Sequence, residues 1–552
     1  MPSDPASPRS TDCSGMIQTG LSVLLALLTS TALAERPEQG ASMLKQFVGV
    51  CQAQADPKRP ELWDHIGFVR HDLSWSKTQP KGPHDWNEAY LEEWGRMVLK
   101  NREYGVEVLP TLDYMAPWAA RRRAWSFTIG QSRYDVAAAN DDKARTATVT
   151  DLKTGKTTSV KLDPGRLPPE DVADWERFVD RVVGFLAKPP YAVKYFQPWN
   201  EAHDQFTGFW CGGMDEYMKT VHLPAARIIR KHGGKVVFGG YPCCGSMRRL
   251  IDVCEKHNAW DTLDVVDIHY FPLSAWQYLY DRVVATGKVE GLWQTEVGFT
   301  KDTSWVPNAY PRFFCWALRR GPWQPRRFMI YQFAYWSPDD PKAYGYLCCF
   351  LRSETLSHHG KAFAVLGRLL GGGVVEPFAD WRTDPVLRTE LNENASSVEG
   401  FSLGKGRRIV LAVHLMKNNA AAIFTDWNLT GDSLHVDWPY TTMRVFLPTT
   451  PAVRIKAASR VGIYGSRLPL RIEPAGKGAC LIVPVCDGDR AERTDNRAAK
   501  AATFYVDVEL AAAEAPHDAR PRALHEQRVP VRPRLTSPVN AGPLRLGAFR
   551  RR

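Results

Sequence analysis

Glycine-rich phosphate-binding signatures are missing from this chain of 552 residues, although it contains 41 glycines. Neither a GxGxxG fingerprint nor a GxxxxGK[ST] loop occurs in it. This absence leaves a doubly wound open sheet as the second choice of fold, because nothing marks its switch point. The eleven cysteines include no CxxC pair and no histidine spacing typical of zinc sites. The sequence therefore predicts neither a metal nor a cofactor.

Long apolar runs are also scarce. The stretch Leu21 to Leu28 is uncharged and apolar but too short to span a bilayer, so no stable membrane insertion is expected. Ala32-Leu33-Ala34 follows it with the small-x-small form of a signal-peptidase site. The pattern predicts a signal peptide over residues 1–34 and a secreted or periplasmic protein, with a buried N-terminal helix as the alternative. Ten cysteines then remain, enough for full pairing in an oxidising compartment.

Charge of one sign is concentrated at the C-terminal end. Residues 516–552 hold nine arginines against Asp518 and Glu526, so they account for +7 of the net charge of +11. This segment is rich in arginine and proline and has no hydrophobic period, which predicts a disordered tail over residues 487–552. A chain that ends near Asp487 is expected to keep its melting temperature. No folded nucleic-acid motif accompanies the basic charge, so no nucleic-acid partner is expected.

The body of the chain alternates short apolar strands with amphipathic helices. The expected strands are 47–50, 66–72, 106–114, 193–201, 235–240, 264–270, 291–298 and 327–336. One helix pattern places Leu91, Trp94, Met97 and Val98 on a single face before Gly105. Eight strand and helix units in about 300 residues predict an α/β fold, a (β/α)8 TIM barrel over residues 35–372.

Two further segments depart from this rhythm. Residues 144–165 alternate β-forming residues around a Lys-Thr-Gly-Lys turn, which predicts a hairpin insertion after the third strand. From about Gly373 short strands and turns follow without a helical period, so a C-terminal β-sandwich domain is expected over residues 373–486.

Polar residues stand at the ends of five predicted strands. Arg70 lies near the end of the second strand, Asn200-Glu201 at the fourth, His269-Tyr270 at the sixth, Glu296 at the seventh and Trp336 at the eighth. In a barrel, these ends meet in one basin at the carboxyl face, where barrel enzymes keep their chemistry. On a regular strand the adjacent side chains of His269 and Tyr270 cannot both face inward.

Glu201 and Glu296 each follow a dry apolar strand. Two carboxylates in one basin push their pKa values apart, so that one serves as a proton donor and the other as an ionised nucleophile. Such a pair performs glycoside hydrolysis with retention when its carboxyl groups lie about 5 Å apart. Flat apolar faces for sugar rings are offered by Trp75, Trp118, Trp199 and Trp336.

This ordered set resembles the paired motif of clan A glycoside hydrolases, retaining enzymes whose two glutamates end the fourth and seventh barrel strands. The resemblance covers Phe47 to about Phe350 and includes the segment "VLPTLDYMAPWA" with Tyr114 and Trp118. Within the clan, a barrel followed by a β-sandwich looks most like the β-xylosidase and α-L-iduronidase family, with the cellulase and mannanase family second. One departure is Ala202, where the family usually has proline.

The resemblance implies a role for each residue. Glu201 would be the general acid and then the base, and Glu296 the nucleophile. Asn200 would hold the sugar 2-hydroxyl, Arg70 and Tyr270 would orient Glu296, and Trp336 would form the floor of the first subsite. His269, Tyr114 and Trp118 would complete the substrate-binding residues.

The sequence therefore predicts a secreted retaining glycosidase, a hydrolase that acts on a polysaccharide or oligosaccharide by double displacement. The alternative is a catalytically silent barrel that binds carbohydrate through its aromatic residues. Both carboxylates, Glu201 and Glu296, favour the enzyme, because a binding module has no need for the pair.

Overall fold

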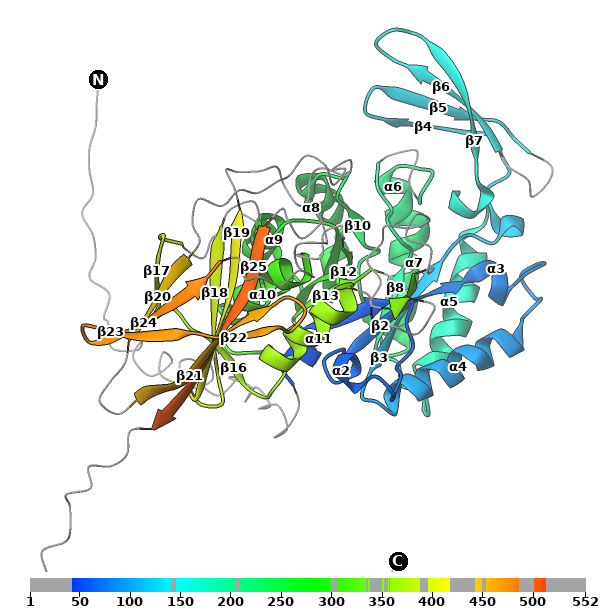
Figure 1. The fold of residues 1–552 in the computed structure, drawn as a ribbon. Coiled ribbons are helices and arrows are strands. Elements are labelled where there is room, and N and C mark those ends of the chain that lie inside the picture. The colour runs from blue at the N-terminus through cyan, green and yellow to red at the C-terminus, as the bar shows by residue number, and fades with distance from the viewer. Residues whose placement is uncertain are drawn as a thin grey trace, which may run out of the picture.

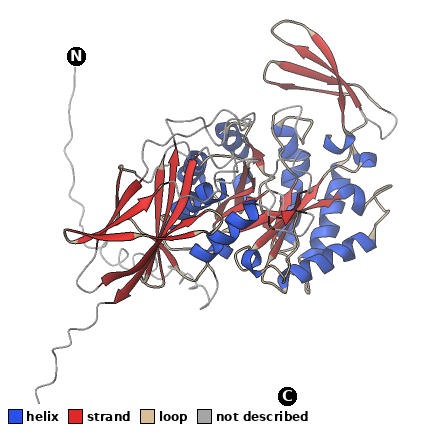
Figure 2. Ribbon diagram, viewed as in Figure 1, coloured by secondary structure: helices blue, strands red, loops and turns tan. Residues whose placement is uncertain are grey.

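The computed structural model describes most of the chain between residues 42 and 512. The described ranges are 42–139, 145–204, 209–298, 305–333, 358–387, 396–416, 442–448, 453–485 and 501–512, with short pieces at 336–337, 350–351 and 356. The predicted signal peptide lies outside them, as does residue 513 onward. Helices surround the strands in one region and a second region consists of strands (Figures 1 and 2).

A curled parallel sheet of nine strands organises the first region. Its order is β10-β11-β12-β13-β1-β2-β3-β8-β9. The strands are β1 (Val48–Cys51), β2 (Phe68–Ser74), β3 (Glu107–Asp113), β8 (Tyr195–Pro198), β9 (Lys235–Val236), β10 (Tyr241–Pro242), β11 (Val265–His269), β12 (Gly291–Val297) and β13 (Phe328–Gln332). This arrangement is consistent with a TIM-like barrel.

The predicted closed barrel of eight strands is wrong: the sheet has nine strands, and its order runs from β10 at one edge to β9 at the other. The strand predicted at 235–240 ends at Val236, and Tyr241–Pro242 forms a separate strand beside β11. Gly239 and Gly240 lie between these strands, and the positive φ of +60° at Gly240 breaks the extended backbone. A single bridge, Val237 to Val265, joins the segment after β9 to β11.

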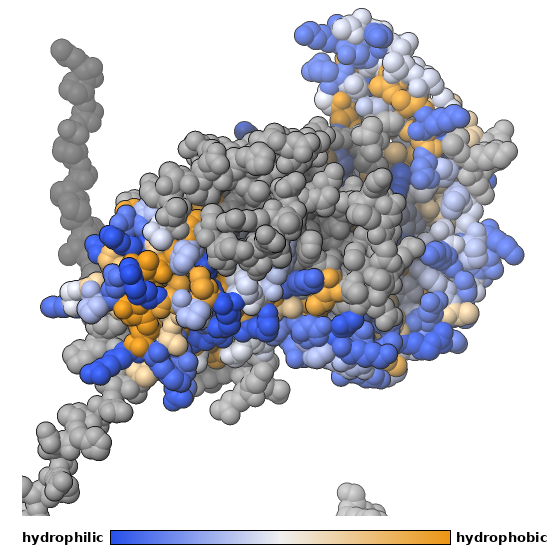
Figure 3. Space-filling model, in the orientation of Figure 1, coloured by the Kyte–Doolittle hydropathy of each residue, from blue (hydrophilic) through white to orange (hydrophobic). Residues whose placement is uncertain are grey.

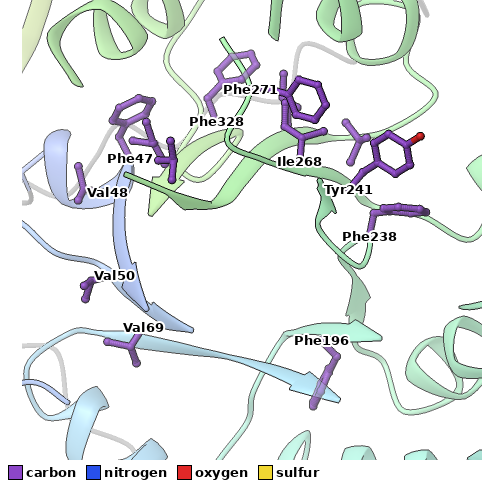
Figure 4. Close-up of a cluster of buried hydrophobic side chains, with 14 of the residues drawn as sticks. Phe47, Val48, Val50, Val69, Phe196, Phe238, Tyr241, Ile268, Phe271 and Phe328 are labelled. Atoms are coloured by element: carbon purple, nitrogen blue, oxygen red, sulfur yellow. The ribbon is translucent and has the colours of Figure 1, made fainter. Parts of the chain in front are cut away.

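Apolar side chains cover both surfaces of the curled sheet. Outward-pointing residues such as Val69, Phe196 and Ile268 pack into a large buried cluster with the helices (Figure 4). A smaller separate cluster is formed by Cys51, Phe68, Leu109, Val237, Val265, Trp293, Met329 and Tyr331. Because these strands are buried on both surfaces, they are the near-continuous apolar runs visible in the sequence.

Helices connect the strands. They are η1 (Leu44–Gln46), α2 (Pro60–Trp63), α3 (Trp75–Thr78), α4 (Glu88–Arg102), η2 (Pro117–Ala119), η3 (Pro164–Arg166), α5 (Val172–Leu186), α6 (Met214–Tyr217), η4 (Met218–His222), α7 (Leu223–Lys231), α8 (Met247–Lys256), η5 (Ala259–Asp261), α9 (Leu273–Leu279), η6 (Tyr280–Val284), α10 (Trp305–Leu318) and α11 (His358–Leu370). Helix α4 buries Leu91, Trp94 and Val98 as its period predicts. No helix in the described part of the chain is long and apolar enough to cross a membrane.

The insertion after β3 is larger than the predicted hairpin. It is a four-stranded antiparallel sheet of β4 (Trp125–Ile129), β5 (Ser132–Val136), β6 (Arg145–Asp151) and β7 (Thr157–Leu162), which projects from the first region (Figure 1). Only β6 and β7 fall in the predicted range of 144–165. The first two strands pair Phe127 with Tyr134, whose rings stack at 4.9 Å between centroids.

The second region consists of two antiparallel sheets. One has the order β16-β18-β19-β25-β21-β22 and the other β17-β20-β24-β23. The strands are β16 (Val375–Pro377), β17 (Arg382–Asp384), β18 (Ser397–Leu403), β19 (Arg408–Met416), β20 (Thr442–Pro448), β21 (Val453–Gly462), β22 (Arg467–Pro469), β23 (Arg471–Ala475), β24 (Gly478–Pro484) and β25 (Ala501–Ala512). Leu411 and Val506 from one sheet share a buried cluster with Val445 and Leu481 from the other.

Strand β25 corrects the predicted start of the tail. Its residues 501–509 pair with β19 on one side and its residues 504–512 pair with β21 on the other, although residues 487–552 were expected to be disordered. Phe504, Val506 and Val508 alternate along it and are fully buried. Elsewhere on this region's surface, apolar side chains gather on the face turned to the viewer in Figure 3, and Leu468 and Ile472 are partly exposed.

The two regions are packed against each other. Helix α10 contacts β16, β18, β19 and β25, and the rings of Phe314 and Phe401 stack at 6.0 Å. Free thiols are carried by Cys51, Cys254, Cys315 and Cys480, three of them deep in the first region's core. The ten cysteines after residue 34 are therefore not all paired in disulfides.

Candidate functional site

Five of the predicted site residues meet at the carboxyl ends of the parallel strands. Arg70 lies on β2, Asn200 and Glu201 follow β8, His269 ends β11 and Glu296 lies on β12. Arg70, Asn200 and His269 are buried, whereas the side chains of Glu201 and Glu296 keep 13% and 12% of their surface exposed. The two carboxylates are thus the site's accessible groups.

Glu296 is held by two donors, one on each carboxyl oxygen. The hydroxyl of Tyr270 donates to Oε1 at 2.7 Å, and Nη1 of Arg70 donates to Oε2 at 3.3 Å. Burial raises the pKa of Glu296 and the nearby Glu201 adds to this, while His269, Arg70 and the hydrogen bond from Tyr270 lower it. The carboxyl group is therefore oriented, and its charge depends on these neighbours.

Arg70 also fixes the amide beside the other glutamate. Its Nη2 donates to Oδ1 of Asn200 at 2.6 Å, and Nδ2 of Asn200 donates to the hydroxyl of Tyr114 at 2.9 Å. The guanidinium of Arg166 lies 3.5 Å above the ring of Tyr114. Asn200 and Tyr114 are thus held together beside Arg70, and their contact with substrate stays a prediction.

His269 lies between the carboxylates. Its Nδ1 is 3.0 Å from Oε1 of Glu201 and 3.6 Å from Oε2 of Glu296, and its Nε2 is 3.0 Å from Oγ1 of Thr295. Burial disfavours the charged ring, but hydrogen bonds to Asp267 and Glu201 and the charge of Glu296 outweigh it and raise the pKa of His269 to about 9. The shift favours the imidazolium form of the ring, which has an N–H on each nitrogen.

Unusual backbone geometry brings these side chains together. Trp199, Glu201 and Tyr270 have positive φ angles of 75°, 52° and 59°, a region that side chains other than glycine rarely adopt. The register between β11 and β12 also shifts between Asp267 and His269. For this reason both His269 and Tyr270 reach the carboxylates, although adjacent residues of a regular strand cannot. Backbone N–H groups of Glu201 and Tyr270 donate to Gly239 and Glu296.

The ring of His269 needs a glycine beside it. A Cβ atom on Gly240 would lie 2.2 Å from Nε2 of His269, closer than any side chain tolerates. Gly240 has a φ of +60° as well, so both space and conformation require glycine there. The break between β9 and β10 therefore makes room for the site.

Three residues under the site were not predicted from the sequence. Gln197, Asp267 and Thr295 are fully buried and join β8, β11 and β12. Gln197 accepts from Nε of Arg70 at 2.7 Å and donates to Oδ2 of Asp267 at 2.5 Å. The sequence could have indicated them, because each is a polar residue within an otherwise apolar predicted strand. Buried polar side chains of this kind have to hydrogen-bond to one another.

Asp113, the last residue of β3, was also missed. It is buried, and neither of its carboxyl oxygens has a hydrogen-bond partner among the described residues. Burial and the nearby Asp72 raise the pKa of Asp113 well above its usual range. The sequence could have indicated Asp113, because it directly precedes Tyr114, a predicted site residue.

Several predicted aromatic residues lie elsewhere. Trp75 and Trp199 are completely buried, so they are core residues and not sugar platforms. Trp118 packs edge-on against Trp75 and donates to the carbonyl of Gln79, and its contact with substrate stays a prediction. Trp336 lies in β14 (Trp336–Ser337), which pairs with β15 (Phe350–Leu351) beyond the end of β13 at Gln332. Its place in a subsite stays a prediction.

Glu201, His269 and Glu296 also have the composition of a metal site. One potential ligand atom of each lies within 4.8 Å of the others. Nδ1 of His269 lies 3.0 Å from Oε1 of Glu201 and 3.6 Å from Oε2 of Glu296, so the three groups also pair with one another as an acid–base cluster.

Comparisons with known proteins give remote likenesses. No family model and no curated protein matches this sequence. Similar solved structures include a family 39 glycoside hydrolase from Bacteroides cellulosilyticus WH2, 13% identical, covering 86% of this chain and 83% of that one with a TM-score of 0.46. A GH30 endoxylanase from Clostridium papyrosolvens C71 is 11% identical, with coverages of 86% and 98% and a TM-score of 0.49.

Endo-glycoceramidase II from Rhodococcus sp. is 14% identical and covers 84% of this chain and 96% of its own, with a TM-score of 0.36. Each TM-score is below 0.5, so the chemistry of this chain is inferred below from its own residues.

Proposed function

We propose that this protein is a retaining glycoside hydrolase in which Glu201 is the acid/base and Glu296 the nucleophile. The observation that carries the proposal is the spacing of the two carboxylates, which have oxygen atoms within 4.8 Å of each other. Retaining enzymes need about 5 Å between the carboxyl groups, and inverting enzymes need about 6.5–9.5 Å to admit a water molecule. In the same proposal the curled sheet is a variant of the (β/α)8 barrel and the antiparallel sheets form a β-sandwich.

The first step breaks the glycosidic bond. Glu296 attacks the anomeric carbon while Glu201 gives its proton to the departing oxygen, so a glycosyl-enzyme and a free hydroxyl are formed. Donors from Tyr270 and Arg70 keep the attacking carboxylate aimed and favour its ionised form. Asn200, fixed by Arg70 and Tyr114, offers its amide to a sugar hydroxyl.

The second step returns the enzyme to its starting state. Glu201, now a carboxylate beside the imidazolium of His269, takes a proton from water, which attacks the anomeric carbon and releases Glu296. Two inversions give net retention. The substrate is a polysaccharide or oligosaccharide, and a carbohydrate is the only partner that the mechanism requires.

Export is part of the proposal. Residues 1–34 have the pattern of a signal peptide. N-terminal sequencing of secreted protein should begin at Glu35. An intact N-terminus on soluble cytosolic protein would contradict export and leave the catalytic proposal untouched.

The two glutamates can be distinguished by their leaving-group dependence. Glu201→Ala should slow aryl glycosides with poor leaving groups severely but spare the first step for dinitrophenolate, which needs no proton. Glu296→Ala should abolish turnover for every leaving group, because no covalent intermediate forms. The surface variant Glu255→Gln, which breaks an exposed pair with Lys288, is the matched control and should keep full activity.

Azide sharpens the test. In Glu201→Ala the small anion enters the vacated space and attacks the intermediate, giving a β-glycosyl azide from a β-glycoside. In Glu296→Ala it attacks the substrate directly and gives the inverted α-azide. Equal loss in both variants without azide products would show that the roles are wrong. Variants as active as the parent would favour a barrel that only binds carbohydrate.

A further inference from the structure

Asp267 occupies the centre of the polar layer beneath the two glutamates. The side chain is fully buried and accepts three hydrogen bonds, from Nε2 of Gln197 at 2.5 Å, from the backbone N–H of Thr295 at 2.9 Å and from its hydroxyl at 2.6 Å. Burying a carboxylate costs several kcal/mol unless a cation lies close by. The cation that meets it is His269, whose Nε2 is 3.5 Å from Oδ2 of Asp267.

His269 is enclosed by groups that fix its orientation. Asp267 comes from its own strand β11, Thr295 and Glu296 come from β12, and Glu201 approaches from the end of β8. Arg70 on β2 reaches the ring through Glu296 on one side and through Gln197 and Asp267 on the other. The adjacent Tyr270 donates to Glu296, and the segment after β9 presents Gly240, which has no side chain.

A chain of hydrogen bonds therefore crosses the ring. Nε2–H of His269 donates to Thr295, whose hydroxyl donates to Asp267, while Nδ1–H on the far side donates to Oε1 of Glu201. Because Oε1 always accepts a hydrogen bond from the imidazolium, a proton carried by Glu201 must reside on Oε2. The acid's proton is thereby placed on one oxygen.

We propose that Asp267 is a positioning residue that acts through His269, keeping the ring charged and its Nδ1–H on Glu201 through both catalytic steps. This rests on the proposed function of Glu201. A purely structural Asp267 would only tie β8, β11 and β12 together, and its loss would lower stability without changing how activity depends on pH.

The first test follows the histidine itself and needs no substrate. In protein labelled with ¹³C at histidine Cε1, with His269 assigned through His269→Gln, the ring should titrate near pH 9 in the parent. In Asp267→Asn the midpoint should fall by one pH unit or more, toward the ordinary value of about 6.5. Asp215→Asn, beside the peripheral His257, is the matched control and should leave the His269 midpoint unchanged.

The second test uses the substrate identified for the parent enzyme. The pH profile of kcat/KM should change in Asp267→Asn and not in Asp215→Asn, because His269 then loses its charge at a lower pH and Glu201 loses a neighbouring cation. The change should be larger for poor leaving groups than for dinitrophenolate, because it acts on the acid. If Asp267→Asn does not fold, Thr295→Val breaks the same relay.

The outcomes separate the two proposals. If His269 is neutral at pH 7 in the parent, or if Asp267→Asn leaves its midpoint unchanged, the positioning role of Asp267 is overturned whether or not the protein is a glycosidase. A shifted titration with no hydrolysis of any glycoside by the parent overturns the role of Glu201 instead. A lowered melting temperature with an unaltered pH profile would leave Asp267 as a structural residue.

Discussion

Buried carboxylates occur in both regions of this molecule, and their partners differ. In the antiparallel sheets Asp507 accepts from Arg408 at 2.6 and 3.0 Å and from Arg467 at 2.6 Å. Burial opposes its ionisation, but these hydrogen bonds and charges lower the pKa of Asp507. Two cations serve one carboxylate there, so the group stays ionised and inert.

At the mouth of the curled sheet the balance is reversed. The three carboxyl groups of Glu201, Asp267 and Glu296 share two cations, Arg70 and His269. One carboxyl group is therefore left without a full counter-charge, and taking up a proton relieves it. The comparison indicates that a surplus of carboxylates marks a reactive cluster, while a surplus of cations marks a structural one.

Removing one arginine from each region should break the comparison most strongly. Arg70→Leu should lower kcat/KM by about 10²–10³-fold, because Glu296 loses a donor and Asn200 loses its anchor. Steady-state kinetics with an aryl glycoside measure this. Arg408→Leu should leave kcat/KM unchanged and lower only the melting temperature. Equal losses of activity in both variants would contradict the distinction.

Truncating the chain before β25 should strongly lower the stability of the second region. A chain ending at residue 500 lacks Phe504, Val506 and Val508, each worth roughly 1.5–3 kcal/mol of burial, which approaches the whole stability of a domain. Its thermal unfolding should begin well below that of the parent. A chain ending at residue 512 is the control, and a lowered melting temperature there would mean that later residues belong to the fold.

The smallest expected effect is on how the free energy of unfolding depends on pH. This dependence should have opposite signs for His269 in the first region and Asp507 in the second. The pKa of His269 is raised from 6.5 to about 9, so its contribution is fully present below pH 6.5 and is lost as pH rises through 9. The shift corresponds to roughly 3 kcal/mol. The lowered pKa of Asp507 gives a contribution present above its ordinary value of 3.8 and lost as pH falls further.

Denaturant unfolding from about pH 2 to pH 10 can check these signs. His269→Gln should flatten the alkaline decline in the free energy of unfolding, and Asp507→Asn should flatten the acid decline. A variant that changed the opposite limb would show that the contacts of these residues do not control their ionisation.

Most strands of the first region could be predicted from the sequence. Parallel strands that are buried on both surfaces consist of nearly continuous apolar residues, and such runs are easy to recognise. Glu201, Glu296 and Arg70 stand at the ends of such runs, so their convergence followed from the fold. The joint orientation of His269 and Tyr270 toward the carboxylates could not be predicted, because it depends on a register shift between β11 and β12 and on the positive φ of Tyr270. Neither feature has a residue signature in this sequence.

Two other predictions were wrong because they relied on residue type or composition alone. The predicted tail was extended back to residue 487 although the run of nine arginines that suggested it begins only at Arg520, and this hid the alternation of Phe504, Val506 and Val508. Trp75 and Trp199 were taken as sugar platforms because tryptophan offers a flat face, whereas both fill the core. Residue type alone does not tell a core ring from an exposed one.

The place of β25 has a consequence for how the protein is made. Strands β19 and β21 flank it, so they cannot complete their sheet until residues 501–512 have left the ribosome. Synthesis at about 5–20 residues per second leaves β19 waiting for several seconds with an unpaired edge, which is prone to wrong pairing. Folding of the second region is therefore a late event, and an exported chain that crosses a membrane unfolded avoids this interval.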